Sequence, residues 1–489
     1  MAMKVNLSCI HRQIFVGVLA WLFMGPMSLA LAQQTQNSSE PASLQQALSR
    51  IETLEFQLGQ MQQALGGTEA AVPAGGDPSF VNGGSCDCQP CCGKCYQCLC
   101  PLDDAPCIDC PRVSTLGTNY NVSVFGAVTL DMLYSRPRAV SKGSPFYLLP
   151  DSTLGFDQDT VSIHARQSTI GAALTGPQFC GFQAGGLVAA LFFNDAVIVD
   201  RYGFLPMQAY GELRNDCWRF AAGLQFDVFN PGAPTVLPFS VLSASGNSGN
   251  SFRGQIRMER FFNPSSNMQW TVQAALSEPV ATTLDPAFRI IEDNGWPNVE
   301  ARIALGIGTP DTSGLEPVRP FQVGISGLGG QIRTTGILAN QVVADVWGLG
   351  VDLRWQMTSC FGIASEFYTG QGLGTYGGGI LQNINLDSVT PSDSTLQSIR
   401  SSGGWLEAFL YWTPCLHSHV GYGLDDPIDR DLAIDQRSRN STAFANLIWD
   451  VNQTFRIGTE FTYRETEYVS PDLLSNEGPG FHTQFQWSF

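Results

Sequence analysis

In the stretch FHTQFQWSF, residues 481–489, aromatic and polar side chains alternate. Successive side chains of a β-strand point to opposite faces, so one face would carry Phe481, Thr483, Phe485, Trp487 and Phe489. The other face would carry His482, Gln484, Gln486 and Ser488. This pattern predicts a β-strand with one apolar and one polar surface.

Three further stretches repeat the pattern, at residues 218–227, 347–355 and 455–464. In each of them the charged residues lie on the face opposite the aromatic residues. Strands that are apolar toward lipid and polar toward a lumen have this character. The strands of a soluble β-sandwich also alternate, so the rest of the chain must distinguish a sandwich from a membrane barrel.

Composition excludes several classes of protein. Charged residues make up 14% of the 489 residues, against about 25% in an average soluble protein. The formal net charge of −17 argues against a nucleic-acid partner, because binding phosphates needs a basic surface. With 44% hydrophobic residues, the chain can bury a large core and is not expected to be disordered.

Residues 1–32 have the features of a secretory signal. Lys4 and Arg12 give a positive start, Ile14–Met24 is an apolar run, and Ala30-Leu31-Ala32 fits a cleavage site. The alternative, an N-terminal membrane anchor, is disfavoured because a spanning helix needs about 20 apolar residues. No later apolar run has that length, so we expect an exported protein without membrane helices. Strands of about 10 residues could still cross a bilayer.

A heptad pattern follows in residues 33–65, after a polar start. Leu44, Ile51, Leu58 and Leu65 recur at one position and Ala47, Leu54 and Met61 at the other. The spacing predicts a short coiled-coil helix of about 33 Å, although a single amphipathic helix packed on the rest of the protein is the alternative. The residues at these heptad positions do not decide whether the coiled coil is a dimer or a trimer.

Residues 119–489 carry the strand pattern, interrupted by turns and loops. Short turns are expected at 175–179, 214–216, 263–267, 357–359, 413–414 and 450–453, and longer loops at 230–251, 370–401 and 424–441. Short turns at one end and long loops at the other are typical of outer-membrane barrels. At roughly 23 residues for each strand and connection, this region predicts an all-β, transmembrane antiparallel β-barrel of about 16 strands.

The chain resembles the bacterial outer-membrane porins, and in particular the DcaP-like trimeric porins. The resemblance is carried by Phe125-Gly126 with Asp131, His164–Ser168 with Gly171, Ala209–Glu212, Gly223 with Phe229, Arg253 with Gln255–Arg257, and Phe489 on an aromatic strand. It implies a homotrimer in the outer membrane, with the N-terminal segment in the periplasm. It also implies passive diffusion of small hydrophilic solutes, with organic anions preferred.

Charged residues on the polar faces agree in part with that function. Arginine suits an anion pore because its planar fork binds carboxylates through two hydrogen bonds. The candidate pore-lining residues are Arg166, Arg219, Arg253, Arg257, Arg302, Arg354, Arg456, Asp352 and Glu366. The acids could instead compensate the arginines and leave little selectivity. The loop 230–251 is a candidate to fold inward and constrict the pore, and an ordinary external loop is the alternative.

Residues 66–118 form a linker and a cysteine-rich segment that departs from the porin pattern. Its nine cysteines are Cys86, Cys88, Cys91, Cys92, Cys95, Cys98, Cys100, Cys107 and Cys110. Some spacings fit metal sites, but disulfides are the default in an exported chain, so we expect no metal and no cofactor. Nine is odd, so a bond must leave the segment or a thiol must stay free.

Four cysteines in the barrel region each follow a short turn: Cys180, Cys217, Cys360 and Cys415. They suggest a disulfide-linked periplasmic collar that joins the segment to the barrel, to neighbouring subunits or to other envelope proteins. The alternative is that they are small apolar residues that fill strand ends. The second function hypothesis follows from the collar: a structural envelope protein whose barrel anchors a disulfide-linked layer.

Enzyme motifs give weak signals. Residues 372–377 fit G-x-G-x-x-G, but two more glycines follow where a helix should begin, so we interpret the stretch as a flexible loop. His417 and His419 share a strand face without an evident third metal ligand, and a surface role is expected. We therefore expect a pore and no catalytic site.

Overall fold

A computed structural model describes residues 121–151, 158–193, 202–279, 295–310, 318–334, 342–385 and 397–489. The signal, the heptad segment and the nine-cysteine segment lie outside these residues, so the predictions about them stay predictions. Among the described residues, none forms a helix with the length and hydrophobicity needed to cross a bilayer.

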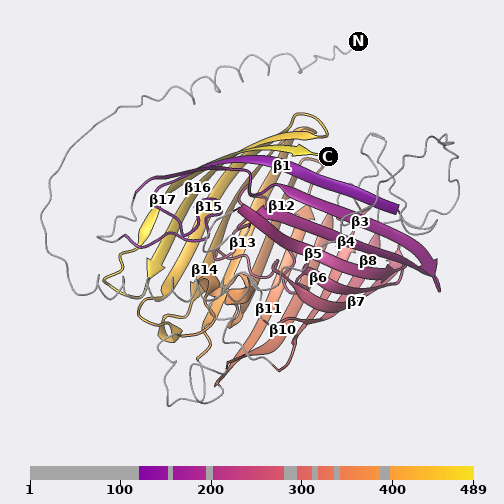
Figure 1. Ribbon diagram of the computed structural model, residues 1–489, viewed down its shortest axis with the longest axis horizontal. Coiled ribbons are helices and arrows are strands. Elements are labelled where there is room, and N and C mark those ends of the chain that lie inside the picture. Colours follow the sequence, from indigo (N-terminus) through magenta and orange to yellow (C-terminus); the bar gives the residue numbers. More distant parts are fainter. Residues whose placement is uncertain are drawn as a thin grey trace, which may run out of the picture. The chain divides into compact units, whose positions relative to one another are not determined.

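The described chain forms one antiparallel sheet that closes on itself (Figure 1). Its strands are β1 (Asn121–Ser135), β2 (Thr160–His164), β3 (Thr169–Phe179), β4 (Phe182–Phe193), β5 (Tyr202–Arg214), β6 (Trp218–Phe226), β7 (Phe252–Ser265), β8 (Met268–Ser277), β9 (Asn298–Ile307), β10 (Phe321–Thr334), β11 (Val342–Gln356), β12 (Phe361–Gln371), β13 (Arg400–Thr413), β14 (Leu416–Pro427), β15 (Arg437–Asp450), β16 (Phe455–Tyr468) and β17 (Asn476–Ser488). From β3 to β17 each strand pairs with the next, and β1 pairs with β2, β3 and β17.

The 17 strands make 16 positions in the barrel wall. β2 and β3 both pair with β1, along successive parts of it, with Ala165–Ser168 between them. They therefore act as one wall strand with an interruption. The predicted all-β barrel of about 16 strands is confirmed.

The closing seam between β1 and β17 converges on Asp131. Its carboxylate accepts hydrogen bonds from Gln167 (2.9 Å) and from Gln484 on β17 (2.8 Å), and His482 lies 3.0 Å away. One buried carboxylate thus contacts side chains from both neighbours of the first strand.

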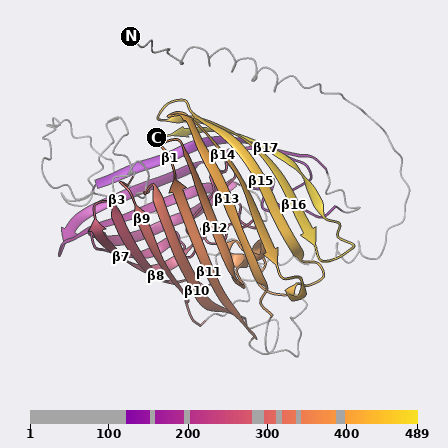
Figure 2. The ribbon, with the colours of Figure 1, turned by 180° about the vertical axis from the view of Figure 1, so that it is seen from behind.

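The two faces of the wall differ as the alternation predicts. On β17, Phe481 and Trp487 are 52% and 62% exposed on the outer face, whereas His482 and Gln484 point inward and are buried. The same division runs round the barrel, whose strands carry many exposed Val, Leu, Ile, Phe and Trp side chains. Figure 2 shows the wall of strands from behind. A closed sheet with an apolar exterior is the arrangement required in lipid, where every backbone group must be paired internally.

Two boundary predictions are wrong. β3 continues through the turn expected at 175–179, because a register shift after Thr175 accommodates Pro177, and the turn is Cys180–Gly181. Both turn residues have positive φ, as in a type I′ hairpin. The loop expected at 424–441 is shorter, because β14 extends to Pro427 and β15 begins at Arg437.

Candidate functional site in the barrel lumen

The segment between β6 and β7, residues 227–251, lies inside the barrel. Its backbone contacts wall strands far around the circumference: Val228 bonds to Glu300 on β9, and Leu237 bonds to Glu460 on β16. Most of its side chains are buried. We call this segment the inner loop.

Four wall glutamates hold the inner loop by accepting hydrogen bonds from its backbone N–H groups. The bonds run from Val228 to Glu300 (2.7 Å), from Gly232 to Glu366 (3.1 Å), from Thr235 to Glu407 (2.5 Å) and from Leu237 to Glu460 (3.0 Å). Buried backbone donors need partners, and a carboxylate is a stronger acceptor than a neutral oxygen. The four carboxylates therefore fix the path of the loop across the lumen.

Close packing also positions the inner loop against the wall. Asn230 lies directly over Gly350 of β11, where a Cβ atom would collide with the Asn230 amide. A larger residue at position 350 would push the loop away from the wall.

Two further segments pack on the inner loop. Residues 372–385, between β12 and β13, bond to it through the Tyr376 and Gly377 carbonyls, which accept from Gly249 and Ala244 at 2.5 and 2.7 Å. The Tyr376 hydroxyl also donates to Glu300 at 3.1 Å. The G-x-G-x-x-G stretch is therefore a buried, hydrogen-bonded segment, and its interpretation as a flexible loop is wrong.

The other segment lies between β1 and β2, and Asn440 of β15 links it to the inner loop. The Asn440 amide donates to the Phe146 carbonyl (3.0 Å) and to Ala244 of the inner loop (2.7 Å). Phe146, Ala244 and Ile380 then share one apolar cluster. The three segments therefore pack together inside the barrel.

A polar cavity of about 230 Å³ remains on the inner side of β3–β10, and it reaches the short-turn ends of several strands. Among the described residues its charged lining side chains are four arginines and two glutamates: Arg214, Arg219, Arg302, Arg319, Glu212 and Glu259. Glutamine, tyrosine and threonine side chains complete the polar lining. We call this space the arginine cavity.

Two of its arginines are ion-paired. Arg219 bonds to Glu212 and, at 3.1 Å, to Glu259. Arg302 binds Asp352 of β11 through two nitrogens, at 2.9 and 2.6 Å. Both guanidinium groups are thereby held in fixed orientations.

The other two arginines have no carboxylate partner among the described residues. Arg214 lies over the Phe261 ring, with its guanidinium carbon 5.4 Å from the ring centroid, and Arg319 donates to the Gly308 carbonyl. The cavity therefore carries more positive than negative side chains.

The remaining predicted arginines are distributed over the wall. Arg253 is fully buried beside Asp227 (2.5 Å), under the Tyr376 ring at 3.7 Å. Arg257 pairs with Glu259 at 2.7 Å. Neither side chain lines the arginine cavity, although Arg257 shares a carboxylate with it.

Arg166, Arg354 and Arg456 lie elsewhere. Arg166 is buried between Phe193 and Tyr202, with 5.6 and 5.7 Å to the ring centroids. Arg354 lies over Phe409, and Arg456 pairs with Asp450 near the short turns. Of the two predicted acids, Asp352 holds Arg302 and Glu366 holds the inner loop, where it also accepts from the indole of Trp405 at 3.1 Å.

The surface role expected for His417 and His419 is wrong, because both rings are buried in the lumen. The Nδ1 of His417 and the Nε2 of His419 are 2.8 Å apart. The Nδ1 of His419 lies 2.7 Å from a Glu407 carboxylate oxygen, and the Nε2 of His417 lies 3.4 Å from one of Asp450. A chain of polar groups thus runs from a short turn to the Thr235 N–H of the inner loop. No group of three or more His, Cys, Asp or Glu side chains in the described ranges is arranged to hold a metal ion.

Sequence reasoning missed Glu300 and Glu407 as anchors of the loop. A signal was present, because each stands between apolar residues on a strand and must point inward. The alternation does not say what an inward carboxylate binds, since its partner comes from a distant loop.

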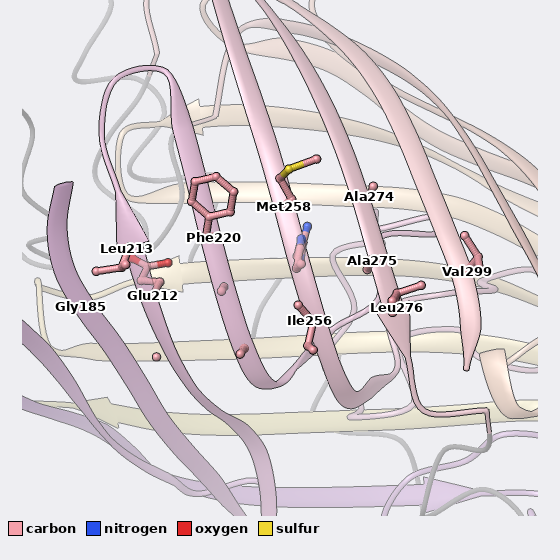
Figure 3. Close-up of a pocket in the computed structure, with 14 residues that line it drawn as sticks. Gly185, Glu212, Leu213, Phe220, Ile256, Met258, Ala274, Ala275, Leu276 and Val299 are labelled. Atoms are coloured by element: carbon pink, nitrogen blue, oxygen red, sulfur yellow. The ribbon is translucent and has the colours of Figure 1, made fainter. Parts of the chain in front are cut away.

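A hollow on the wall, about 750 Å³, is lined mainly by apolar side chains of β5–β9 (Figure 3). Phe220, Ile256, Met258 and Leu276 line it, and all four are exposed on the outer face. It belongs to the apolar exterior, although Glu212 lines both this hollow and the arginine cavity.

Several solved structures have a similar architecture. The outer membrane channel DcaP of Acinetobacter baumannii has a TM-score of 0.58 and 15% sequence identity, covering 76% of this chain and 98% of that chain. OprB of Pseudomonas putida (TM-score 0.48, 8% identity, 76% and 94% covered) and the trimer form of OmpT of Vibrio cholerae (0.46, 10%, 76% and 100%) are more distant. No protein-family model matches the sequence, and no curated protein sequence does either. The chain has the fold of an outer-membrane channel, a closed 16-strand barrel of the porin type.

Proposed function

We propose that the protein is an outer-membrane porin through which small hydrophilic solutes diffuse passively, with small organic anions preferred. The observation that carries this proposal is the arginine cavity, with four arginines against two glutamates in a lumen narrowed by the inner loop. Arg214 and Arg319 have donors to offer a carboxylate, and Arg219 and Arg302 are held in place by their own ion pairs.

Single-channel recording in planar bilayers, with a salt gradient to give the reversal potential, tests the proposal. We expect small conductance steps with a reversal potential on the anion side. An Arg214→Gln/Arg319→Gln double variant should lose most of that preference while it still conducts. Cation selectivity of the unaltered protein would overturn the anion preference and leave the porin.

The matched control is Arg260→Gln. Arg260 lies on the outer face of β7, over Trp218 and Phe262 at 4.7 and 4.9 Å. This substitution removes the same charge outside the lumen, so it should leave the reversal potential unchanged.

We also propose a homotrimer, on the basis of the heptad segment at 44–65 and the resemblance to trimeric porins. Conductance steps that occur in groups of three would support it. Single conductance steps, from a protein that native mass spectrometry finds to be a monomer, would contradict it.

A second candidate, a structural barrel that anchors a disulfide-linked envelope layer, has one observation in its favour. All four barrel cysteines are exposed, as anchoring points must be. A folded barrel without any conductance would favour this candidate over the porin.

A further inference from the structure

The four barrel cysteines lie at one rim of the barrel. Cys180 is in the turn between β3 and β4, Cys217 precedes β6, Cys360 precedes β12 and Cys415 precedes β14. In an up-and-down barrel these connections all fall at the same end, the end with the short turns. All four residues are exposed, so the alternative that they are apolar fillers of strand ends is wrong.

Three of the four share a local structure that fixes the backbone. The N–H of Cys217, Cys360 and Cys415 donates to a side-chain oxygen two residues earlier, at 2.9, 3.3 and 3.2 Å. Their carbonyls accept from Phe261, Tyr411 and Asp450 of the adjoining strands, at 2.9, 2.7 and 2.8 Å. These cysteines are therefore held rigidly at the rim.

Rigid placement prevents these thiols from pairing with one another. Cys180 and Cys217 belong to neighbouring hairpins, whose turns are two strand spacings apart, or about 10 Å. A disulfide needs Cα atoms within about 7 Å. Cys360 and Cys415 have the same relation across β12 and β13. Any disulfide partner must therefore come from outside the described residues.

The part of the chain before β1 carries further thiols, and β1 begins at this rim. β1 begins at Asn121, which pairs with Thr175 near the Cys180 turn, so β1 starts at the short-turn end. Cys110 precedes Asn121 by about 11 residues, a reach of up to about 38 Å. A 16-strand barrel with strands tilted by about 40° is about 30 Å across, so the cysteines at 86–110 are tethered within reach of all four rim positions.

We propose that the rim cysteines are docking points for the nine-cysteine segment, joined to it by disulfide bonds within the same chain. In each bond a rim thiol and a segment thiol lose two protons and two electrons and form S–S. The electrons pass to a disulfide of a thiol–disulfide oxidant of the envelope, which becomes a dithiol. The odd count of nine agrees with bonds that leave the segment.

Mass spectrometry of the full-length protein tests this proposal. The protein is isolated from envelopes without reductant, its free thiols are alkylated, and it is digested under non-reducing conditions. We expect peptides that link residues 86–110 to the peptides carrying Cys217, Cys360 or the other rim cysteines. Alkylated, unlinked rim cysteines would overturn the proposal, and so would rim cysteines bonded only to another protein.

A variant series gives a second readout. Replacing all four rim cysteines by serine should expose additional alkylatable thiols in the segment and change the mobility of the unreduced protein on a denaturing gel. Ser266→Ala, in the cysteine-free turn between β7 and β8, is the control and should change neither. Heat-modifiable migration shows that each barrel has folded, and an unchanged thiol count in a folded serine variant would contradict the proposal.

Discussion

The two halves of the lumen are built from the same alternating strands, yet their charged residues have different tasks. Where the inner loop lies against the wall, Glu300, Glu407 and Glu460 are buried and accept its N–H groups. At the arginine cavity, Arg214 and Arg319 face open space instead. An inward charge on a barrel strand is thus structural where a loop covers it and accessible to solutes where none does.

Releasing the inner loop is the strongest way to abolish this difference. Glu366→Ala/Glu407→Ala/Glu460→Ala removes three acceptors, each worth about 1.5–3 kcal/mol when charged. We expect the loop to leave the wall and the single-channel conductance to rise by about twofold or more. The Gln versions of the same variants keep an acceptor and should have a smaller effect. Unchanged conductance in the Ala variant would mean that the loop does not limit the pore.

The ion pairs of the two halves should also differ in strength. Arg253→Ala leaves Asp227 buried and unpaired and removes a bond to the Thr375 carbonyl, so a loss of about 3–5 kcal/mol in unfolding free energy is expected. Arg456→Ala breaks a partly exposed pair with Asp450 and should cost at most about 1 kcal/mol. Urea unfolding in lipid vesicles measures both variants. Equal losses would contradict the distinction.

The smallest expected effect is at the long-loop end, in the 3₁₀ turn Asp429–Asp431. The Arg400 guanidinium donates to Asp431 at 2.5 and 2.6 Å, and these bonds lower the pKa of the Asp431 carboxyl. A lowered folded-state pKa stabilises the protein above the ordinary pKa, near 4, and this stabilisation is lost as pH falls through the folded-state pKa. Asp431→Asn should therefore lower the midpoint of thermal unfolding slightly at pH 7 and not at pH 2. The exposed neighbour Asp435 gives the control, Asp435→Asn, for which no such difference is expected.

The barrel was predictable because one local rule, the period of two, governs every strand. Stretches such as 481–489 define both faces without knowledge of any distant contact. Loop positions were less predictable, since Pro177 is tolerated within β3 by a register shift that depends on the pairing with β4. Cys180 then occupies the turn itself.

The site was only partly predictable for a related reason. Arg219 and Arg302 were predicted from strand position, and the structure places both at the arginine cavity. Arg214 and Arg319 were missed because they lie at strand ends, where alternation is weak. The burial of His417 and His419 depends on a loop that enters from the far side of the barrel, and no local pattern contains that information.

The seam at Asp131 has a consequence for how the barrel forms. The first strand finds its second neighbour only when the last strand has been made, so closure depends on a contact between residues more than 340 positions apart in sequence. Until then the sheet has two unpaired edges, which are sites for aggregation. Such long-range closure is slow and cooperative, and a chain that ends before β17 would lack both the edge pairing and two of the partners of Asp131. The residues of β17 therefore determine whether β1 is ever stable.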